Sequence, residues 1–209
     1  TEANLGEIRF HSSSLQCQHF AWRQYPDIQL SLLGEYQLQN ACTVLNTVET
    51  LRSHGWNLPD EAVLAGLRDV VWPGRFERVR QKPWLIIDGG HNPQCARAIA
   101  DSLREYFPGK KILFLMGVLA DKDFEGIYEA LLPLAERIYA VTPDSPRALT
   151  ADKLCERLAD EYQFTAAKPY GSVADALKAV LADAGEDDVI CVCGSLYMIG
   201  EARRELGLR

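Results

Sequence analysis

The run Asp88–Pro93 (DGGHNP) places a carboxylate, two glycines and a histidine between an apolar stretch and an amphipathic helix pattern. The two glycines allow the backbone to turn sharply and to approach a ligand, and Pro93 suits the first position of a helix. We therefore expect Asp88 and His91 to project into a crevice where they could hold a polar ligand. The structural alternative is that Asn92 caps the helix and Asp88 braces the turn.

Two later loops carry residues that suit an anion. Lys122 follows the apolar stretch Lys111–Val118, and Ser195 follows Gly194 at the start of the last helix pattern. A Gly-Ser entrance leaves backbone N–H groups free at the start of a helix, which favours a carboxylate or a phosphate there. The alternatives are a solvated lysine and a serine that only caps its helix.

Upstream, Arg75 follows the rigid turn Trp72–Gly74 (WPG), and its guanidinium offers a two-pronged donor that suits phosphate. Arg78 and Arg80 repeat at a spacing of two, so a charged outer strand face is the alternative for this stretch. Asn40 falls within an expected helix, where asparagine has poor propensity and another role would explain it. The sequence contains no P-loop, zinc-protease or nucleophile-elbow motif. These features alone predict an α/β domain with an anion site.

The elements that must position these residues alternate regularly in the later part of the chain. The expected strands are Trp84–Asp88, Lys111–Val118, Arg137–Thr142, Phe164–Ala167 and Asp188–Cys193, and the expected helices are Cys95–Phe107, Phe124–Leu134, Ala151–Tyr162, 173–181 and Leu196–Leu206. Apolar strands that each precede an amphipathic helix indicate an α/β fold with a mostly parallel sheet and helices on both faces. Ligands bind beyond the carboxyl ends of the strands in such sheets.

The first part of the chain has a different pattern. Three short strands are expected at Leu5–Phe10, Gln16–Phe20 and Ile28–Leu33, followed by helices at Tyr36–His54 and from Pro59 to about Val70. Three strands without a helix between them and without an evident partner sheet suggest an incomplete unit, so we expect residues 1–33 to be loosely held. The WPG turn is the expected domain boundary.

Composition restricts the class of protein. The 209 residues include 22 basic and 29 acidic side chains, a formal net charge of −7, and 47% hydrophobic residues. These values exclude a disordered chain and give no electrostatic reason to expect a nucleic acid or an anionic membrane as partner. None of the six cysteines forms a C-x-x-C pair, which is typical of reduced thiols in a cytoplasmic protein. Cys191 and Cys193 read as buried strand cysteines rather than as a metal site.

Five motifs in this order resemble one family. They are 32–41 (LLGEYQLQNA), 72–77 (WPGRFE), 87–93 (IDGGHNP), 117–123 (GVLADKD) and 192–197 (VCGSLY). Together they are similar to the bacterial folylpolyglutamate synthase/dihydrofolate synthase family of the Mur ligase superfamily. The resemblance covers nearly the whole chain from Leu32 onward.

The resemblance implies two domains and an enzymatic activity. Residues 1–72 would be the carboxy-terminal remainder of an ATP-binding central domain of P-loop type, and residues 73–209 a Rossmann-like carboxy-terminal ligase domain. Members of the family use ATP to join L-glutamate to folate or to dihydropteroate through an acyl phosphate. The P-loop and the ligands of Mg²⁺ would then precede Thr1. The chain is expected to be monomeric and to contain no catalytic residue of its own.

Four residues would contact ATP if the family's roles carry over. Asn40 resembles the asparagine that contacts adenine, and Arg75 the arginine that contacts phosphate. Asp88 resembles the aspartate that contacts the ribose, and His91 lines the same crevice.

Two further residues, Lys122 and Ser195, would face the incoming glutamate by analogy with the superfamily. The chain departs from the family at Tyr36, where a histidine is usual, and at Gly90, where an alanine is common. Two other functions remain open. They are another amino-acid ligase of the Mur superfamily and a non-catalytic nucleotide-binding or interaction module.

Overall fold

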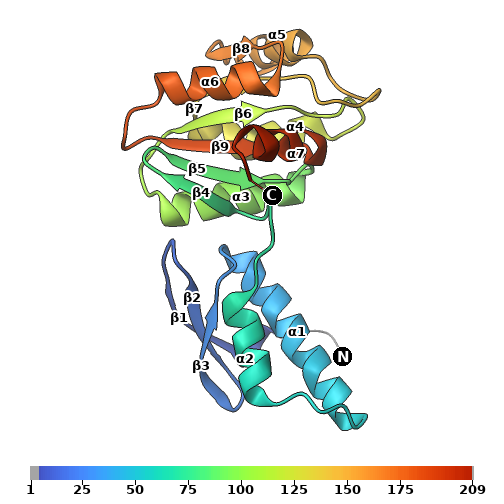
Figure 1. Cartoon of the computed structure of the whole chain (residues 1–209). Helices are drawn as coiled ribbons and strands as arrows, with labels where there is room; N and C mark the ends of the chain where they lie inside the picture. Colours follow the sequence, from blue (N-terminus) through green and yellow to red (C-terminus); the bar gives the residue numbers. More distant parts are fainter. Residues whose placement is uncertain (1–4, 209) are drawn as a thin grey trace. The chain divides into compact units, whose positions relative to one another are not determined.

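The computed structural model describes residues 5–208 and divides the chain into two compact units, Thr1–Pro73 and Gly74–Arg209 (Figure 1). The division falls inside the WPG turn, one residue after the boundary expected from the sequence. Each unit has its own sheet and its own core, and each is described separately below.

The first unit is a three-stranded antiparallel sheet with two helices. It contains a 3-10 turn η1 (Leu5–Glu7), the strands β1 (Ile8–Ser13), β2 (Gln18–Trp22) and β3 (Tyr25–Leu30), and the helices α1 (Glu35–Ser53) and α2 (Asp60–Asp69). The strands pair in the order β1-β2-β3, so β2 is bonded on both sides.

The first strands therefore form a sheet of their own, and our expectation that they lack one was wrong. Phe20 and Trp22 of β2 and Ile28 of β3 are fully buried and form one core with residues of α1 and α2. The turn between β2 and β3 depends on Arg23, which adopts a positive φ of 46°. This local conformation shortens the connection and lets β3 begin at Tyr25, earlier than the apolar pattern indicated.

This core leads to a prediction for hydrogen exchange. Amides of β2 should exchange slowly because the strand is bonded on both sides and carries two fully buried aromatic side chains. Amides of the edge strand β1 should exchange faster. Exchange by mass spectrometry at peptide resolution tests this, and exchange of β2 at the rate of an unstructured peptide would restore the original view that residues 1–33 are loosely held.

The second unit contains a six-stranded sheet in the order β4-β5-β9-β6-β7-β8. Its strands are β4 (Glu77–Gln81), β5 (Trp84–Asp88), β6 (Ile112–Met116), β7 (Ala135–Ala140), β8 (Ala167–Pro169) and β9 (Val189–Cys193). Only the pairing of β4 with β5 is antiparallel. The mostly parallel α/β fold expected from the sequence is confirmed. All five residues of β6 and of β9 are buried, which explains their continuous apolar runs.

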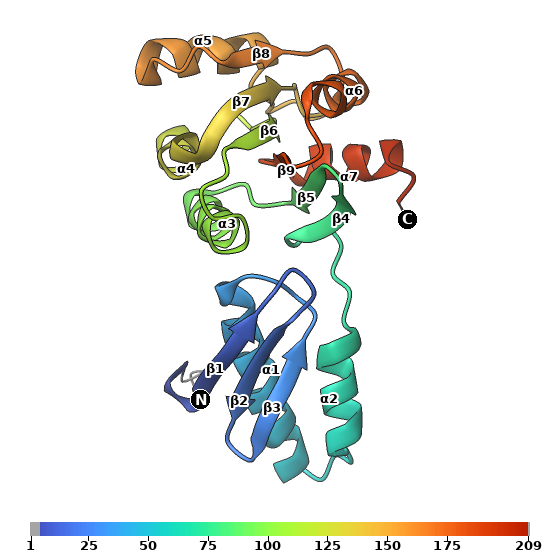
Figure 2. The same ribbon diagram turned by 90° about the vertical axis from the view of Figure 1, so that its left-hand side faces the viewer.

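Helices cover both faces of this sheet. They are α3 (Pro93–Tyr106), α4 (Phe124–Leu131, continued by the 3-10 turn η2 at Leu132–Leu134), α5 (Ala151–Tyr162), α6 (Val173–Asp183) and α7 (Leu196–Glu205). Helices α3 and α4 lie on one side of the sheet, and α6 and α7 lie on the other (Figure 2). None of the helices within residues 5–208 combines the length and the apolar character needed to cross a bilayer.

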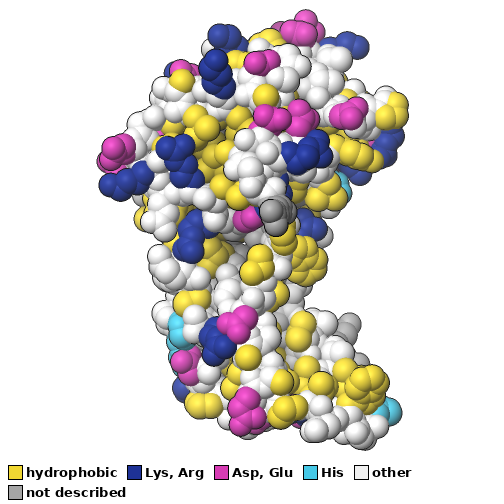
Figure 3. All heavy atoms as spheres, viewed as in Figure 1, with side chains coloured by type: hydrophobic (Ala, Val, Ile, Leu, Met, Phe, Trp, Pro, Cys, Tyr) yellow, Lys and Arg dark blue, Asp and Glu magenta, His cyan; other side chains and the backbone are white. Residues whose placement is uncertain are grey.

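Strand β4 was not expected as a separate element. It is an edge strand that carries Arg78 and Arg80, so the charged outer strand that the spacing of these residues allowed is present. Charged side chains are a common protection for a sheet edge. On the face of the molecule shown in Figure 3, basic and acidic side chains are interspersed over the second unit.

Candidate functional site

The candidate site lies where three loops leave the same edge of the six-stranded sheet. Strand β9 lies between β5 and β6, and its last residue, Cys193, pairs with Asp88 on one side and with Met116 on the other. The loops after these three strands therefore begin at the same level. They contain the DGGHNP, GSLY and GVLADKD motifs, as expected for a ligand site at the carboxyl ends of parallel strands.

Asp88 fixes the first of these loops. Its side chain is only 4% exposed. Its Oδ1 accepts a hydrogen bond of 2.7 Å from the backbone N–H of Gly90, and its Oδ2 accepts one of 2.8 Å from that of Phe76. Our expectation that Asp88 projects into an open crevice was wrong. The carboxylate turns inward because two buried backbone donors need an acceptor, which is the turn-bracing alternative.

Arg75 is held against this loop by the backbone. The N–H of Gly89 donates to the carbonyl of Gly74 over 2.8 Å, next to the bond from Phe76 to Asp88. A guanidinium nitrogen of Arg75 lies 3.5 Å from the position that a β-carbon on Gly89 would take. The segment Gly74–Phe76 is thus fastened to the DGG turn by two hydrogen bonds. The partly exposed cation of Arg75 lies at the carboxyl end of β5.

Glycines allow the three loops to interlock. A β-carbon at Gly89 would lie 2.4 Å from Cδ2 of Leu196, in the first turn of α7. Gly194 has a φ of +109°, donates its N–H to the carbonyl of Gly90 over 3.0 Å, and would place a β-carbon 2.6 Å from the carbonyl oxygen of Gly117. A side chain at either glycine would push the loops apart, so these positions hold the site's shape.

His91 is partly exposed and has a defined orientation. Its Nδ1 lies 3.0 Å from the carbonyl oxygen of Gly89. Because a carbonyl can only accept, Nδ1 carries the hydrogen and Nε2 is the ring nitrogen left for a ligand. Asn92 caps α3 by accepting from the N–H of Cys95 at 2.8 Å, with Pro93 at the helix start, so the capping role that was the structural alternative is confirmed for Asn92.

Ser195 occupies the N-cap position of α7, but its side chain makes no capping hydrogen bond. The residue is 2% exposed. The serine is thus not the ordinary cap that was the alternative to an anion site. The start of α7 keeps the positive end of a helix dipole at this edge of the sheet.

Lys122 lies in the loop between β6 and α4. The loop is fastened by Arg147, whose carbonyl accepts from Ala120 over 2.7 Å and whose guanidinium contacts Asp121 over 2.7 Å. Among residues 5–208, no hydrogen bond or ion pair joins the Lys122 ammonium to another side chain, and the residue is partly exposed. The next aspartate, Asp123, caps α4 by accepting from Gly126.

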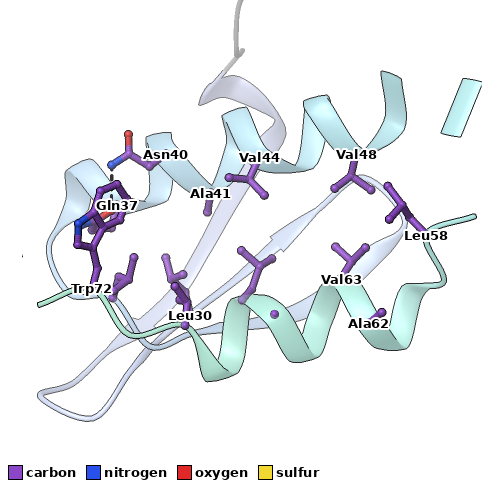
Figure 4. Close-up of a pocket in the computed structure, with 14 residues that line it drawn as sticks. Leu30, Gln37, Asn40, Ala41, Val44, Val48, Leu58, Ala62, Val63 and Trp72 are labelled. Atoms are coloured by element: carbon purple, nitrogen blue, oxygen red, sulfur yellow. Dashed lines mark hydrogen bonds between the residues drawn. The ribbon is translucent and has the colours of Figure 1, made fainter. Parts of the chain in front are cut away.

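Asn40 belongs to the first unit and is described apart from the other five residues. It is exposed on α1 and donates from Nδ2 to Oε1 of the buried Gln37 over 2.9 Å. Both line one end of an apolar groove of about 380 Å³ between α1, α2 and β3, together with Trp72 (Figure 4). The polar amide of Asn40 thus lies at the end of a groove whose remaining lining is mostly aliphatic and includes Val44 and Val63.

The described residues offer no cluster of metal ligands. No group of three or more His, Cys, Asp or Glu side chains within residues 5–208 could hold a metal ion.

The hydrogen bond to Cys193, followed by burial, raises the pKa of the Cys191 thiol well above its ordinary value. The two strand cysteines are free and buried, as expected.

Sequence reasoning missed the role of Glu77. Its Oε2 accepts from the N–H of Gly74 over 2.8 Å, and its Oε1 forms an ion pair with Arg203 of α7. Glu77 therefore ties the WPGR turn to the last helix. Its position inside the WPGRFE motif was the available signal, but the charge alternation of the strand pointed to a solvated face.

The packing around position 90 explains why this residue is a glycine. A β-carbon there would lie 2.7 Å from Cδ1 of Ile99 and 2.9 Å from Cβ of Cys95. The alanine that is common in the family would not fit against these two side chains of α3 without movement.

Comparisons with known proteins agree with this geometry. The sequence model of the protein family described as "Mur ligase, glutamate ligase domain" matches residues 74–196. The dihydrofolate synthase/folylpolyglutamate synthase of Bacillus subtilis is 30% identical over 183 residues, covering 87% of this chain and 42% of the relative. The enzyme of the same name from Mycobacterium tuberculosis is 35% identical over 198 residues, covering 88% of this chain and 41% of the relative.

Solved structures show the same similarity. The folylpolyglutamate synthase of Mycobacterium tuberculosis complexed with ADP superposes with a TM-score of 0.85 at 30% identity, covering 98% of this chain and 49% of that one. The FolC protein of E. coli in complex with DHPP and ADP superposes with a TM-score of 0.78 at 27% identity, covering 96% and 46%. The chain therefore spans less than half the length of the proteins to which it is similar.

Proposed function

Because the chain belongs to the Mur ligase family, with a glutamate ligase domain over residues 74–196, we propose that it is the carboxy-terminal part of an ATP-dependent folylpolyglutamate synthase. The enzyme would add L-glutamate to folate and could accept dihydropteroate as a dihydrofolate synthase. The observation that carries this proposal is the fastening of the partly exposed Arg75 to the DGG turn at the ligand edge of the sheet. Relatives of this name match the chain over both units.

The proposed reaction needs positioned charge more than reactive side chains. A carboxylate of the folate substrate attacks the γ-phosphate of ATP, and ADP leaves. The resulting acyl phosphate is then attacked by the amine of glutamate, which displaces phosphate and forms the amide. Arg75 would neutralise charge on the transferring phosphoryl group, where a placed guanidinium is most effective. Because Arg75 belongs to a turn held by backbone bonds, little ordering is required when phosphate arrives.

The nucleoside would be held by three residues. The amide of Asn40 can both donate to and accept from an adenine edge. The Nε2 of His91 is free to accept a hydrogen bond at the crevice. Both carboxylate oxygens of Asp88 already accept a hydrogen bond from the backbone. A ribose hydroxyl would therefore have to donate to the second lone pair of one of these oxygens. Its larger contribution is to hold the turn that carries Arg75.

Glutamate would lie near the start of α7. The Lys122 ammonium is a suitable partner for a substrate carboxylate, since it has no ion pair among residues 5–208. The uncapped first turn of α7 at Ser195 offers backbone N–H groups to a second carboxylate. Residues 5–208 contain no group of three or more His, Cys, Asp or Glu side chains that could hold a metal ion. We propose that the ligands of the Mg²⁺ that accompanies ATP belong to another part of the full protein. We propose a monomeric, cytoplasmic enzyme.

The isolated chain should have no ligase activity. It contains no P-loop sequence and no metal site among the described residues, and the chemistry above requires ATP to be held in place. The chain is incubated with ATP, Mg²⁺, L-glutamate and either tetrahydrofolate or dihydropteroate, and products are separated by liquid chromatography and mass spectrometry. Glutamylated product above the level of a chain-free control would show that residues 1–209 suffice for catalysis.

A further inference from the structure

The outer face of the first unit carries a thiol, an imidazole and a carboxylate in series. The Sγ of Cys17 lies 3.4 Å from Nε2 of His19, and Nδ1 of the same ring lies 3.0 Å from Oδ1 of Asp27. The three residues come from the hairpin of β1 and β2 and from β3. None of them takes part in the function proposed above.

The hairpin fixes the thiol in this position. Ser14 and Cys17 are joined by two hydrogen bonds across the turn. The N–H of Ser14 donates to the carbonyl of Cys17 over 3.0 Å, and the Oγ of Ser14 accepts from the N–H of Cys17 over 3.4 Å. His19 lies between Gln18 and Phe20, which are both buried, and is itself 34% exposed. The side chain of Asp27 is 62% exposed.

The face that carries these groups is open within the described structure. Figure 2 shows α1 behind the sheet and no described helix or strand of the first unit in front of it. Cys17 itself is partly exposed in the described structure.

The order of the groups defines their protonation. A carboxylate only accepts, so the bond from Asp27 places the hydrogen of the neutral ring on Nδ1 and leaves a lone pair on Nε2 facing the thiol. The ring can therefore take the proton of Cys17, and Asp27 stabilises the imidazolium that forms. Such an adjacent base is the usual way to activate a cysteine nucleophile.

We infer that Cys17 is a reactive modification site for small disulfides of the glutathione type, activated by His19 and positioned by Asp27. The Cys17 thiolate attacks one sulfur of the disulfide, the S–S bond of the reagent breaks, and a mixed disulfide forms on Cys17. The departing thiolate takes the proton held by His19 and leaves as a free thiol. The exchange converts one disulfide and one thiol into another disulfide and another thiol, so it needs no further oxidant.

The other cysteines provide an internal comparison. Cys42, Cys191 and Cys193 are buried. Cys95 and Cys155 are partly exposed, and within the described chain neither lies within hydrogen-bond distance of an imidazole. Burial, with Asp152 and Glu156 as further causes, raises the pKa of Cys155 to about 11, which keeps that thiol protonated. Cys17 should therefore react first.

The experiment follows the modification of the 209-residue chain by oxidised glutathione near neutral pH, with peptide mass spectrometry at timed intervals. Cys17 should acquire glutathione about tenfold faster than Cys95 or Cys155, since an unassisted thiol is only a few per cent thiolate at this pH. Cys17→Ser should remove the fast phase. His19→Gln should slow the reaction of Cys17 about tenfold, and Asp27→Asn should slow it by a smaller factor.

The matched control is His11→Gln. His11 is an exposed histidine on β1 whose Nε2 lies 3.0 Å from the carbonyl oxygen of Pro26. Within residues 5–208 no hydrogen bond joins it to Cys17, so this variant should react as the unchanged chain does. Circular dichroism of each variant shows that the sheet is retained. A Cys17 rate that is unchanged in His19→Gln, or that equals the rates of Cys95 and Cys155, would overturn the inference.

Discussion

Arg75→Ala in the complete enzyme is expected to lower kcat about a hundredfold while the KM for ATP changes little. Arg75 belongs to a turn that is fixed to the DGG loop by the bonds from Gly89 to Gly74 and from Phe76 to Asp88. A cation in this position interacts most strongly with the charge that develops during phosphoryl transfer, and less with bound ATP. Such an interaction contributes to turnover rather than to ground-state binding.

Arg80→Ala is the matched control, since it removes a guanidinium from the neighbouring edge strand. Arg80 is exposed, and its Nε donates to the carbonyl of Lys82 over 2.8 Å. Steady-state kinetics with ATP varied should therefore be unchanged in this variant. Equal losses in the two variants would indicate a general effect of surface charge and would contradict the phosphate role of Arg75.

Asp88→Ala should destabilise the second unit by about 3 kcal/mol, because two buried backbone donors lose a charged acceptor. The donors are the N–H groups of Gly90 and Phe76, and the aspartate is 4% exposed. Thermal unfolding of the 209-residue chain should show a fall of about 10 °C for the transition of this unit. Such a fall would not be expected of a side chain that only faced a solvated crevice.

Asp160→Ala serves as the control for Asp88. Asp160 is exposed near the end of α5, so its removal should change the melting temperature by about 1 °C or less. In the complete enzyme, Asp88→Ala should also reduce kcat, since the turn that carries Arg75 would loosen. If Asp88→Ala melts like the unchanged chain but raises the KM for ATP, direct binding of the ribose is its main role and turn bracing is not.

The central strands could be predicted from the sequence because they are buried on both faces. Strands β5 and β9 are continuous apolar runs, and a helix follows each of them. This pattern is typical of a mostly parallel sheet that is covered on both faces. The loops that follow the strands could be located for the same reason. The orientation of the Asp88 side chain could not be predicted from the sequence. It depends on a hydrogen bond from Phe76, a residue twelve positions earlier that adopts a positive φ of 42°.

The first unit was harder to predict because its strands depend on one another. Phe20 and Trp22 alternate with partly exposed positions, but a half-buried strand does not reveal whether its partner strand precedes or follows it in the sequence. The positive φ of Arg23 and the irregular register between Phe20 and Trp22 fix that partnership locally. The Cys17–His19–Asp27 series was missed for a similar reason, since its third member is brought close only by the pairing of β2 with β3.

The most direct measurement uses the complete protein with a folate or dihydropteroate substrate whose reacting carboxylate is labelled with ¹⁸O. The substrate is mixed with ATP, Mg²⁺ and L-glutamate, and the products are analysed by mass spectrometry. We predict a product longer by one glutamate, one ADP formed per amide, and one ¹⁸O atom in the phosphate released, because the carboxylate oxygen passes through an acyl phosphate. ATP-dependent glutamylation with no label in the phosphate would contradict the mechanism. No glutamylation of either substrate, with ADP released in the presence of a different acceptor, would assign the chain to another amino-acid ligase of the family.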